Sequence, residues 1–229
     1  MNDPRTPLPQ RQLALDLGHR PAYGREDFLV SPGNREAVEW IDRWPEWPGH
    51  AVALFGPAGC GTSHLSQVFA LKAGAVALAA PDLSAAAVGN SLVRATAFVV
   101  EDGGLADERA LFHLFNAVRE KRGALLLTGR EPPARWRTEL ADLRSRLASI
   151  PAVGIAPPDD AMMEAVLVKL FADRQLGVAP DVIAFTLRRI DRSFAAARRL
   201  VATADKVSLA GKRPITIPLV KSIIGDEIA

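Results

Sequence analysis

Short apolar runs alternate with amphipathic stretches through the middle of the chain. Five such runs, the last weaker than the others, lie at residues 51–55, 75–79, 97–100, 124–127 and 152–156. Short continuous runs of this kind are typical of strands buried on both faces. Stretches with helical spacing separate most of them, as at 108–121, where apolar residues recur every three or four positions. The alternation predicts an α/β fold in which helices cover both sides of a parallel sheet.

Helical periodicity without a strand signal dominates the last third of the chain, after Pro157 and Pro158. The stretches with this periodicity lie at residues 159–174, 180–190 and 193–209. A last helix follows, with Pro218 in its first turn, where a missing N–H is tolerated. The pattern predicts a small all-helical domain at the C-terminus.

The first residues differ from both of these regions. Four prolines within residues 4–21 disfavour a helix there, so we expect a mobile tail. The regular pattern begins near Asn34, which is suited to cap a helix that Pro45 ends. The chain is therefore expected to have three parts: a tail over residues 1–24, an α/β body over 25–156 and a helical domain over 157–229.

The composition is that of a chain with its own hydrophobic core. Apolar residues make up 48% of the 229 residues and charged residues 24%, a balance typical of globular proteins. The net charge of +2 is not the strong basic footprint of a dedicated DNA-binding protein. The single cysteine, Cys60, cannot form an internal disulfide, which favours a reducing compartment. No apolar run approaches the roughly 18 residues that cross a bilayer, and the N-terminus has no apolar signal segment, so we expect a cytoplasmic protein that does not bind membranes.

A glycine-rich segment between the first strand and the next helix carries a phosphate-binding pattern. It matches G-x-x-x-x-G-K-[ST] except at the lysine, which is replaced by Thr62. Glycines let backbone N–H groups point at phosphate oxygens, and the following helix adds the positive end of its dipole. The alternative is a glycine turn without a ligand. The candidate nucleotide-binding residues are Gly56, Pro57, Ala58, Gly59, Cys60, Gly61, Thr62, Ser63 and His64.

Two carboxylates, Glu101 and Asp102, follow the apolar run at 97–100. In a parallel sheet this strand ends at the same edge as the phosphate loop, where acids hold Mg²⁺ and orient water. With the hydroxyl group of Ser63 they form the predicted magnesium site. Because Thr62 removes the cation that reaches the β and γ phosphates, we expect weak binding of ADP or ATP and poor ATPase activity.

From residue 28 onward the sequence resembles the DnaA-type AAA+ proteins. The segments that resemble the adenine-flanking, sensor I and sensor II regions of this family lie at residues 28–34, 125–133 and 190–192. The resemblance implies that Val30 flanks the adenine, that Thr128 is the sensor I residue and that Arg192 is the sensor II residue. It also implies a P-loop AAA+ sheet flanked by helices, with a C-terminal helical lid.

Further likenesses within this family concern partners. Residues 142–147 resemble the segment that carries the arginine finger, which implies that role for Arg146, with Arg144 as the rival. Residues 214–221 resemble the C-terminal end of Hda-type regulators. The residues that resemble the sliding-clamp-binding motif of such regulators are Gln12, Leu13, Leu15 and Leu17.

The resemblance implies a regulator of chromosome replication initiation. Bound to the sliding clamp, and to DNA only through the clamp, it would stimulate ATP hydrolysis by a DnaA-type initiator through an arginine supplied in trans. Because the sequence ends after the lid-like helices, we expect the initiator's helix-turn-helix DNA-binding domain to be absent. The sequence leaves open whether the chain also forms a homodimer.

Three other functions are compatible with parts of the sequence. An autonomous AAA+ motor or helicase loader acting on DNA would hydrolyse ATP without a partner. A P-loop kinase of small molecules would need a substrate cleft and a basic phosphate clamp, and the missing lysine counts against it. An adaptor that has kept the fold but binds no nucleotide would give no calorimetric signal with ADP and Mg²⁺.

Overall fold

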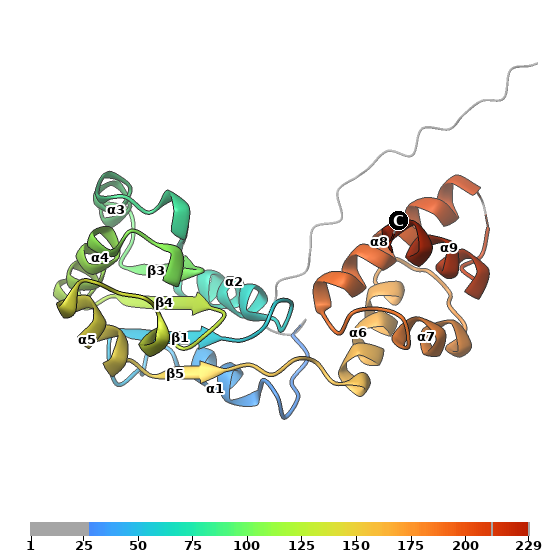
Figure 1. The fold of residues 1–229 in the computed structure, drawn as a ribbon, viewed down its shortest axis with the longest axis horizontal. Helices are drawn as coiled ribbons and strands as arrows, with labels where there is room; N and C mark the ends of the chain where they lie inside the picture. Colours follow the sequence, from blue (N-terminus) through green and yellow to red (C-terminus); the bar gives the residue numbers. More distant parts are fainter. Residues whose placement is uncertain (1–27, 212, 229) are drawn as a thin grey trace, which may run out of the picture.

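The structure is a computed structural model that describes residues 28–211 and 213–228. Within this part of the chain, parallel strands form a five-stranded sheet in the order β2-β3-β4-β1-β5 (Figure 1). The strands are β1 (Ala51–Phe55), β2 (Val76–Ala79), β3 (Ala97–Glu101), β4 (Ala124–Gly129) and β5 (Ala152–Gly154). The flanking helices are α1 (Arg35–Arg43), α2 (Thr62–Ala73), α3 (Ala85–Leu92), α4 (Glu108–Glu120) and α5 (Ala141–Ser149).

The direction of each crossover decides which face of the sheet its helix covers. The chain moves one way across the sheet from β1 to β2, and the other way from β2 to β3, β3 to β4 and β4 to β5. Since such crossovers are right-handed, the helix of the first connection lies on the face opposite to the helices of the other three. Accordingly, α1 and α2 cover one face, while α3, α4 and α5 cover the other.

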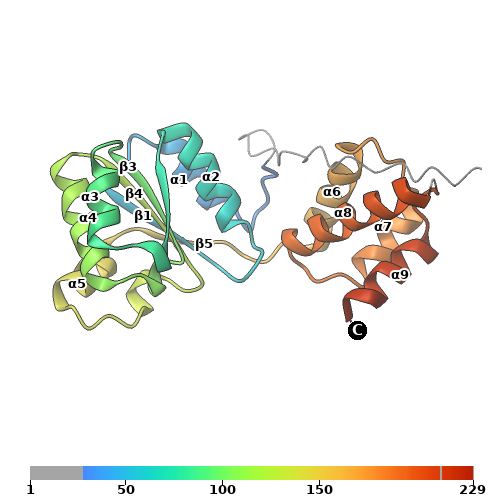
Figure 2. The same ribbon diagram turned by 90° about the horizontal axis from the view of Figure 1, so that it is seen from above.

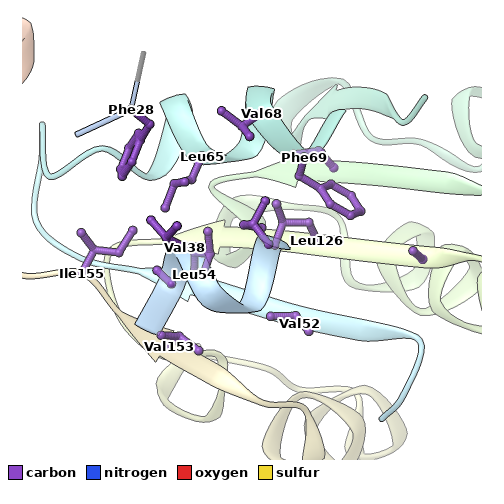
Figure 3. Close-up of a cluster of buried hydrophobic side chains, with 14 of the residues drawn as sticks. Phe28, Val38, Val52, Leu54, Leu65, Val68, Phe69, Leu126, Val153 and Ile155 are labelled. Atoms are coloured by element: carbon purple, nitrogen blue, oxygen red, sulfur yellow. The ribbon is translucent and has the colours of Figure 1, made fainter. Parts of the chain in front are cut away.

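Strand side chains alternate between these two cores. In β4, Leu126 packs with the residues of α1 and α2, whereas Leu125 and Leu127 pack with those of α4 and α5. Figure 3 shows Leu126 in the first of these cores, beside Val52 and Leu54 of β1 and below α2. All of these strand residues are fully buried, which is why the sequence shows continuous apolar runs instead of alternation.

A separate group of helices follows the sheet and has its own apolar core. It consists of α6 (Asp160–Ala172), α7 (Pro180–Leu187), α8 (Phe194–Gly211) and α9 (Ile217–Ile228). Its core includes Leu167, Phe171, Leu200 and Val220, and none of its members comes from the sheet. Figures 1 and 2 both place this group beside the end of the sheet body where α2 begins. The prediction of a parallel α/β sheet with a C-terminal helical region is thereby confirmed.

Two local details differ from the sequence-based expectations. Asn34 is the residue before α1, but its side chain does not cap that helix; its Oδ1 accepts from the Ser31 N–H at 2.7 Å and its Nδ2 donates to the Leu29 carbonyl at 3.0 Å. The amide group therefore shapes the segment that leads into the helix. The strand β2 lies at an edge of the sheet and is half-exposed, because only β3 pairs with it among the described strands.

Candidate functional site

The loop between β1 and α2 has glycine where other residues do not fit. Gly59 and Gly61 have φ angles of 76° and 109°, a region that favours glycine. A Cβ on Gly56 would lie 2.4 Å from the carbonyl oxygen of Ile155, and a Cβ on Gly59 would lie 2.3 Å from the Cβ of Ser193. These glycines therefore serve both the bend of the loop and the close approach of neighbouring chain segments.

The backbone amides of this loop form an anion-binding arrangement. Within the described residues, no acceptor binds the N–H groups of Ala58, Gly59, Gly61, Thr62 and Ser63. Successive unpaired amides at the start of a helix attract anions, and the helix dipole adds to that attraction. The loop thus fits the phosphate groups of a nucleotide.

Residue 62 itself adds no positive charge to this loop. Thr62 is the first residue of α2 and is half-buried, and Ser63 after it is exposed. The loop therefore offers a phosphate group neutral donors only. A neutral cradle can hold a diphosphate but stabilises the charge of a hydrolytic transition state less well.

The acids after β3 contact hydroxyl groups of neighbouring elements. Glu101 Oε1 lies 2.9 Å from Oγ of Ser66, a buried residue of α2. The same hydroxyl group lies 3.0 Å from the carbonyl oxygen of Ser63, so Ser66 links two of the three predicted magnesium ligands, Glu101 and Ser63. Asp102 has a φ of 51°, and its N–H donates to Oγ1 of Thr128 at 3.2 Å. Ser66 is not among the residues predicted from the sequence, where its only signal is its position one helical turn after Ser63.

The magnesium site remains a prediction. Ser63 and Asp102 are exposed at the carboxyl edge of the sheet, and Glu101 is half-buried. Nowhere in residues 28–211 and 213–225 do three or more His, Cys, Asp or Glu side chains gather in a way that could hold a metal ion. An ion at this edge would therefore need oxygens from the nucleotide or water in addition to these carboxylates.

The first turn of α8 packs directly on the phosphate loop. The N–H of Phe194 donates to the carbonyl oxygen of Gly59 at 3.2 Å, and the Phe194 ring lies 3.2 Å from where a Cβ on Gly61 would be. From another side the ring of Phe28 lies 3.5 Å from the same point and meets the ring of His64 edge to face, with centroids 5.1 Å apart. Two aromatic rings therefore flank the glycine that begins α2.

The predicted adenine-flanking residue differs in burial from its neighbour in sequence. Val30 is 46% exposed, whereas Phe28 is only 6% exposed. Figure 3 shows Phe28 above the core formed by Leu65 and its neighbours, near the first turn of α2. The adenine-flanking role of Val30 stays a prediction, and Phe28 is the residue of this segment that packs against the phosphate loop.

Two arginines of the helical region have different partners. Arg192, the predicted sensor II residue, pairs with Asp160 at the start of α6; Nη2 lies 2.9 Å from Oδ1, and the side chains are 63% and 65% exposed. Arg198, which the sequence analysis did not single out, is half-buried in α8, and its Nη2 lies 3.2 Å from Nδ1 of His64. Of these two arginines, only Arg198 contacts the helix that follows the phosphate loop.

The two arginine-finger candidates in α5 also have different surroundings. Arg146 is half-buried, with Cζ 4.9 Å from the ring centroid of Phe112 in α4. Arg144 is exposed, and its Nη1 donates to the carbonyl oxygen of Thr138 at 3.1 Å. In Figures 1 and 2, α5 lies at the end of the sheet body that is far from the helical region, whereas the phosphate loop faces that region. The helix that carries Arg146 therefore lies away from the phosphate loop of its own chain.

A carboxylate of α4 anchors the start of α5. The Glu108 side chain accepts hydrogen bonds from the N–H of Glu139, at 2.9 and 3.1 Å, and from the N–H of Leu140 at 2.8 Å. Leu140 is the N-cap residue of α5, which has no side-chain cap of its own. Glu108 also stands in the first turn of α4, so it lies at the positive ends of two helices.

Two further predictions concern other parts of the chain. The predicted clamp-binding residues Gln12, Leu13, Leu15 and Leu17 lie outside the described residues. Among the helices of residues 28–211 and 213–228, none combines the length and the apolar character that a membrane span requires.

Solved structures identify the class of fold. Domain III of the replication initiation protein DnaA from Thermotoga maritima matches with a TM-score of 0.74 and 17% identity, over 90% of this chain and 97% of that chain. AMPPCP-bound DnaA from Aquifex aeolicus matches with a TM-score of 0.66 and 19% identity, over 82% of this chain and 65% of that chain. With the glycine loop after β1 and the C-terminal helices, these likenesses define an AAA+ fold.

Sequence comparisons make the relationship more specific. Residues 160–224 match the family described as "Hda, lid domain". The chromosomal replication initiator protein DnaA of Thermomicrobium roseum is 28% identical over 246 aligned positions, which cover 91% of this chain. The chain spans about half the length of this curated relative, 51% of it. The chain is thus an Hda-like, DnaA-related AAA+ protein.

Proposed function

We propose that this protein regulates the initiation of chromosome replication by supplying an arginine to a DnaA-type initiator. In the proposed complex, Arg146 reaches the ATP bound by the initiator and stabilises the charge that develops during hydrolysis. An arginine supplied in this way is worth about 10³–10⁵-fold in rate in related systems. The protein is then an activator of a partner's ATPase and a weak ATPase by itself.

One observation carries this proposal: the chain holds a guanidinium group far from its own phosphate loop. Arg146 stacks on Phe112 and belongs to α5, the helix at the far end of the sheet body, while Thr62 leaves the loop without its usual cation. A stacked guanidinium keeps its N–H groups free at the edge of its plane, where they can bind a phosphate. The bonds from Glu108 to the start of α5 hold this helix in one position before a partner arrives.

The nucleotide site of the chain itself has a regulatory role in this proposal. The loop at residues 56–64 holds ADP, or more weakly ATP, through its backbone amides. A nucleotide bound there supplies negatively charged phosphates with Mg²⁺, which Ser63, Glu101 and Asp102 help to hold. Thr128 lies at the same edge of the sheet, bonded to the Asp102 N–H. The AMPPCP-bound state of the Aquifex aeolicus DnaA structure supports nucleotide binding by this fold.

The remaining parts of the proposal concern recruitment. The tail over residues 1–24 binds the sliding clamp through Gln12 and the three leucines at 13, 15 and 17, as an extended peptide in an apolar pocket. The domain over 25–156 then meets the initiator, and the helical domain over 157–229 forms the lid. Contact with DNA is indirect, through the clamp, and the protein acts in the cytoplasm.

The test measures ATP hydrolysis by a DnaA-type initiator in the presence of clamp-loaded DNA. We expect the wild-type protein to stimulate hydrolysis, Arg146→Ala to return the rate to that of the initiator alone, and Arg144→Ala to keep most of the stimulation. Equal stimulation by the wild type and Arg146→Ala would contradict the proposal. Rapid ATP turnover by the isolated protein would favour an autonomous motor.

A further inference from the structure

The helix α8 is oriented so that one of its faces meets the phosphate loop. Ser193 precedes α8, and its Oγ accepts from the Ala196 N–H at 3.1 Å, which fixes the direction of the first turn. Phe194 contacts both Gly59 and Gly61. Residues four positions apart share a helix face, so the next side chain on this face is Arg198.

Arg198 brings a positive charge to the helix that follows the phosphate loop. Its Nη2 lies 3.2 Å from Nδ1 of His64, and a guanidinium group has only donors. In this contact Nδ1 is therefore the acceptor. His64 is itself the third residue of α2, directly after Ser63.

The guanidinium group of Arg198 retains unused hydrogen-bonding capacity. It carries five N–H donors, and within the described residues it forms one hydrogen bond and no ion pair. Arg198 is half-buried, so its charge has lost part of its hydration. A cation in this position is stabilised by an anion that arrives nearby.

Arg192 does not provide the same charge. It is bonded to Asp160, a carboxylate of the same helical region, and both side chains are mostly exposed. Its positive charge is thus balanced locally by that carboxylate. Arg198 lacks such a carboxylate among the described residues.

From this geometry we propose that Arg198 contacts the phosphates of a nucleoside diphosphate or triphosphate bound by the loop, and so replaces the missing lysine at position 62. This inference rests on the nucleotide binding included in the proposed function. The charge comes from the lid, so phosphate binding and the contact of α8 with the loop support each other. Nucleotide release then accompanies separation of Phe194 from Gly59.

The test is calorimetry of the full chain with ADP and Mg²⁺. We expect Arg198→Ala to weaken ADP binding about 10-fold to 100-fold, since a charge-assisted hydrogen bond is lost. The matched control is Arg199→Ala, which changes the exposed neighbour in the same helix and is expected to change affinity less than about twofold. Arg198→Gln, which retains part of the packing, should resemble Arg198→Ala.

A charge rescue separates electrostatics from packing. Adding Thr62→Lys to Arg198→Ala restores a cation at the loop and should recover most of the lost affinity for ADP. Adenosine has no phosphate, so its binding should be the same in Arg198→Ala and the wild type. Both results are expected only if the role of Arg198 is phosphate binding.

Several outcomes would overturn the inference. They are ADP affinity unchanged in Arg198→Ala, a greater loss in Arg192→Ala, failure of Thr62→Lys to rescue, or no binding of ADP by the wild type at millimolar concentration. Stimulation of initiator ATPase by Arg198→Ala is measured in parallel. Because that stimulation depends on Arg146, a failure of the Arg198 inference is distinguishable from a failure of the proposed regulatory function.

Discussion

The phosphate loop and the helix α5 differ in the groups that each offers to a phosphate. The loop presents unpaired amides at Ala58, Gly59 and residues 61–63, without the lysine that such loops usually carry. The helix α5, at the opposite end of the sheet body, presents an arginine, Arg146, which stacks on Phe112. The loop offers neutral donors that suit a phosphate bound by this chain. The helix α5 offers a positive charge that suits a phosphate bound by a partner. The comparison supports a protein whose two regions serve two different nucleotides.

Among substitutions that test the role of the phosphate loop, the largest effect is expected at Gly59. A Cβ there meets the Cβ of Ser193 at 2.3 Å, and the φ of 76° is costly for alanine. We expect Gly59→Ala to cost about 2–4 kcal/mol, by separating the lid from the loop, and to weaken ADP binding. Thermal unfolding and calorimetry measure both effects, and Gly49→Ala, which has open space around it, is the control. Equal melting temperatures for the two variants would show that this contact is not important.

Near α5, the substitution expected to have the largest effect on stability and on stimulation of the initiator is at Glu108. Its carboxylate accepts hydrogen bonds from Glu139 and Leu140, and removing it leaves the first turn of α5 without these acceptors. We expect Glu108→Ala to lower stability by about 2 kcal/mol and to reduce stimulation of the initiator, with ADP affinity unchanged. Glu120→Ala, at the exposed end of the same helix, serves as the control. A loss of ADP affinity would show that the two regions are coupled.

A smaller effect is expected when the ring beneath Arg146 is removed. A cation–π contact of this kind contributes about 0.5–1 kcal/mol, so Phe112→Leu should reduce stimulation about two- to fivefold without abolishing it. The matched control is Phe185→Leu, since the ring of Phe185 also lies under an arginine, Arg189, but in the lid. Titrating the protein against a fixed amount of initiator gives the maximal rate. Stimulation that is equally reduced by both variants would argue against a specific role of the stacking.

The smallest effect is expected at Arg192. Its ion pair with Asp160 is mostly exposed, and such pairs contribute less than about 1 kcal/mol. We expect Arg192→Ala to leave the melting temperature within roughly 2 °C of the wild type and to change ADP affinity less than Arg198→Ala does. A loss of ADP affinity larger than that of Arg198→Ala would favour the sensor II role predicted for Arg192.

The sequence predicted the sheet well because most of its strands are buried on both faces. The runs at 51–55 and 124–127 became β1 and β4, with the latter extended by two residues. The helix α3 was not predicted. It contains Gly89, and Val88 is its only buried residue, so it shows little apolar periodicity. Its N-cap Ser84 accepts from the Ala87 N–H and supplies one local signal for it.

The candidate site was predictable only where its residues are close in sequence. The phosphate loop follows from a local pattern of glycines. The contact between Arg198 and His64 spans 134 positions, and it depends on how the lid lies against the loop. The bonds between Glu108 and Leu140 likewise join two helices on one face of the sheet. Side chains of such separated elements give no periodic signal, so the structure was needed to find them.

The burial of Cys60 has a consequence for solution experiments. It is the single cysteine of the chain, it lies in the phosphate loop with about 1% of its surface exposed, and its Sγ sits close to Gly56. A maleimide reagent can alkylate this thiol only after the phosphate loop moves away from the neighbouring strand and exposes Cys60. The rate of labelling of the native chain therefore reports how often this opening occurs, without any engineered probe.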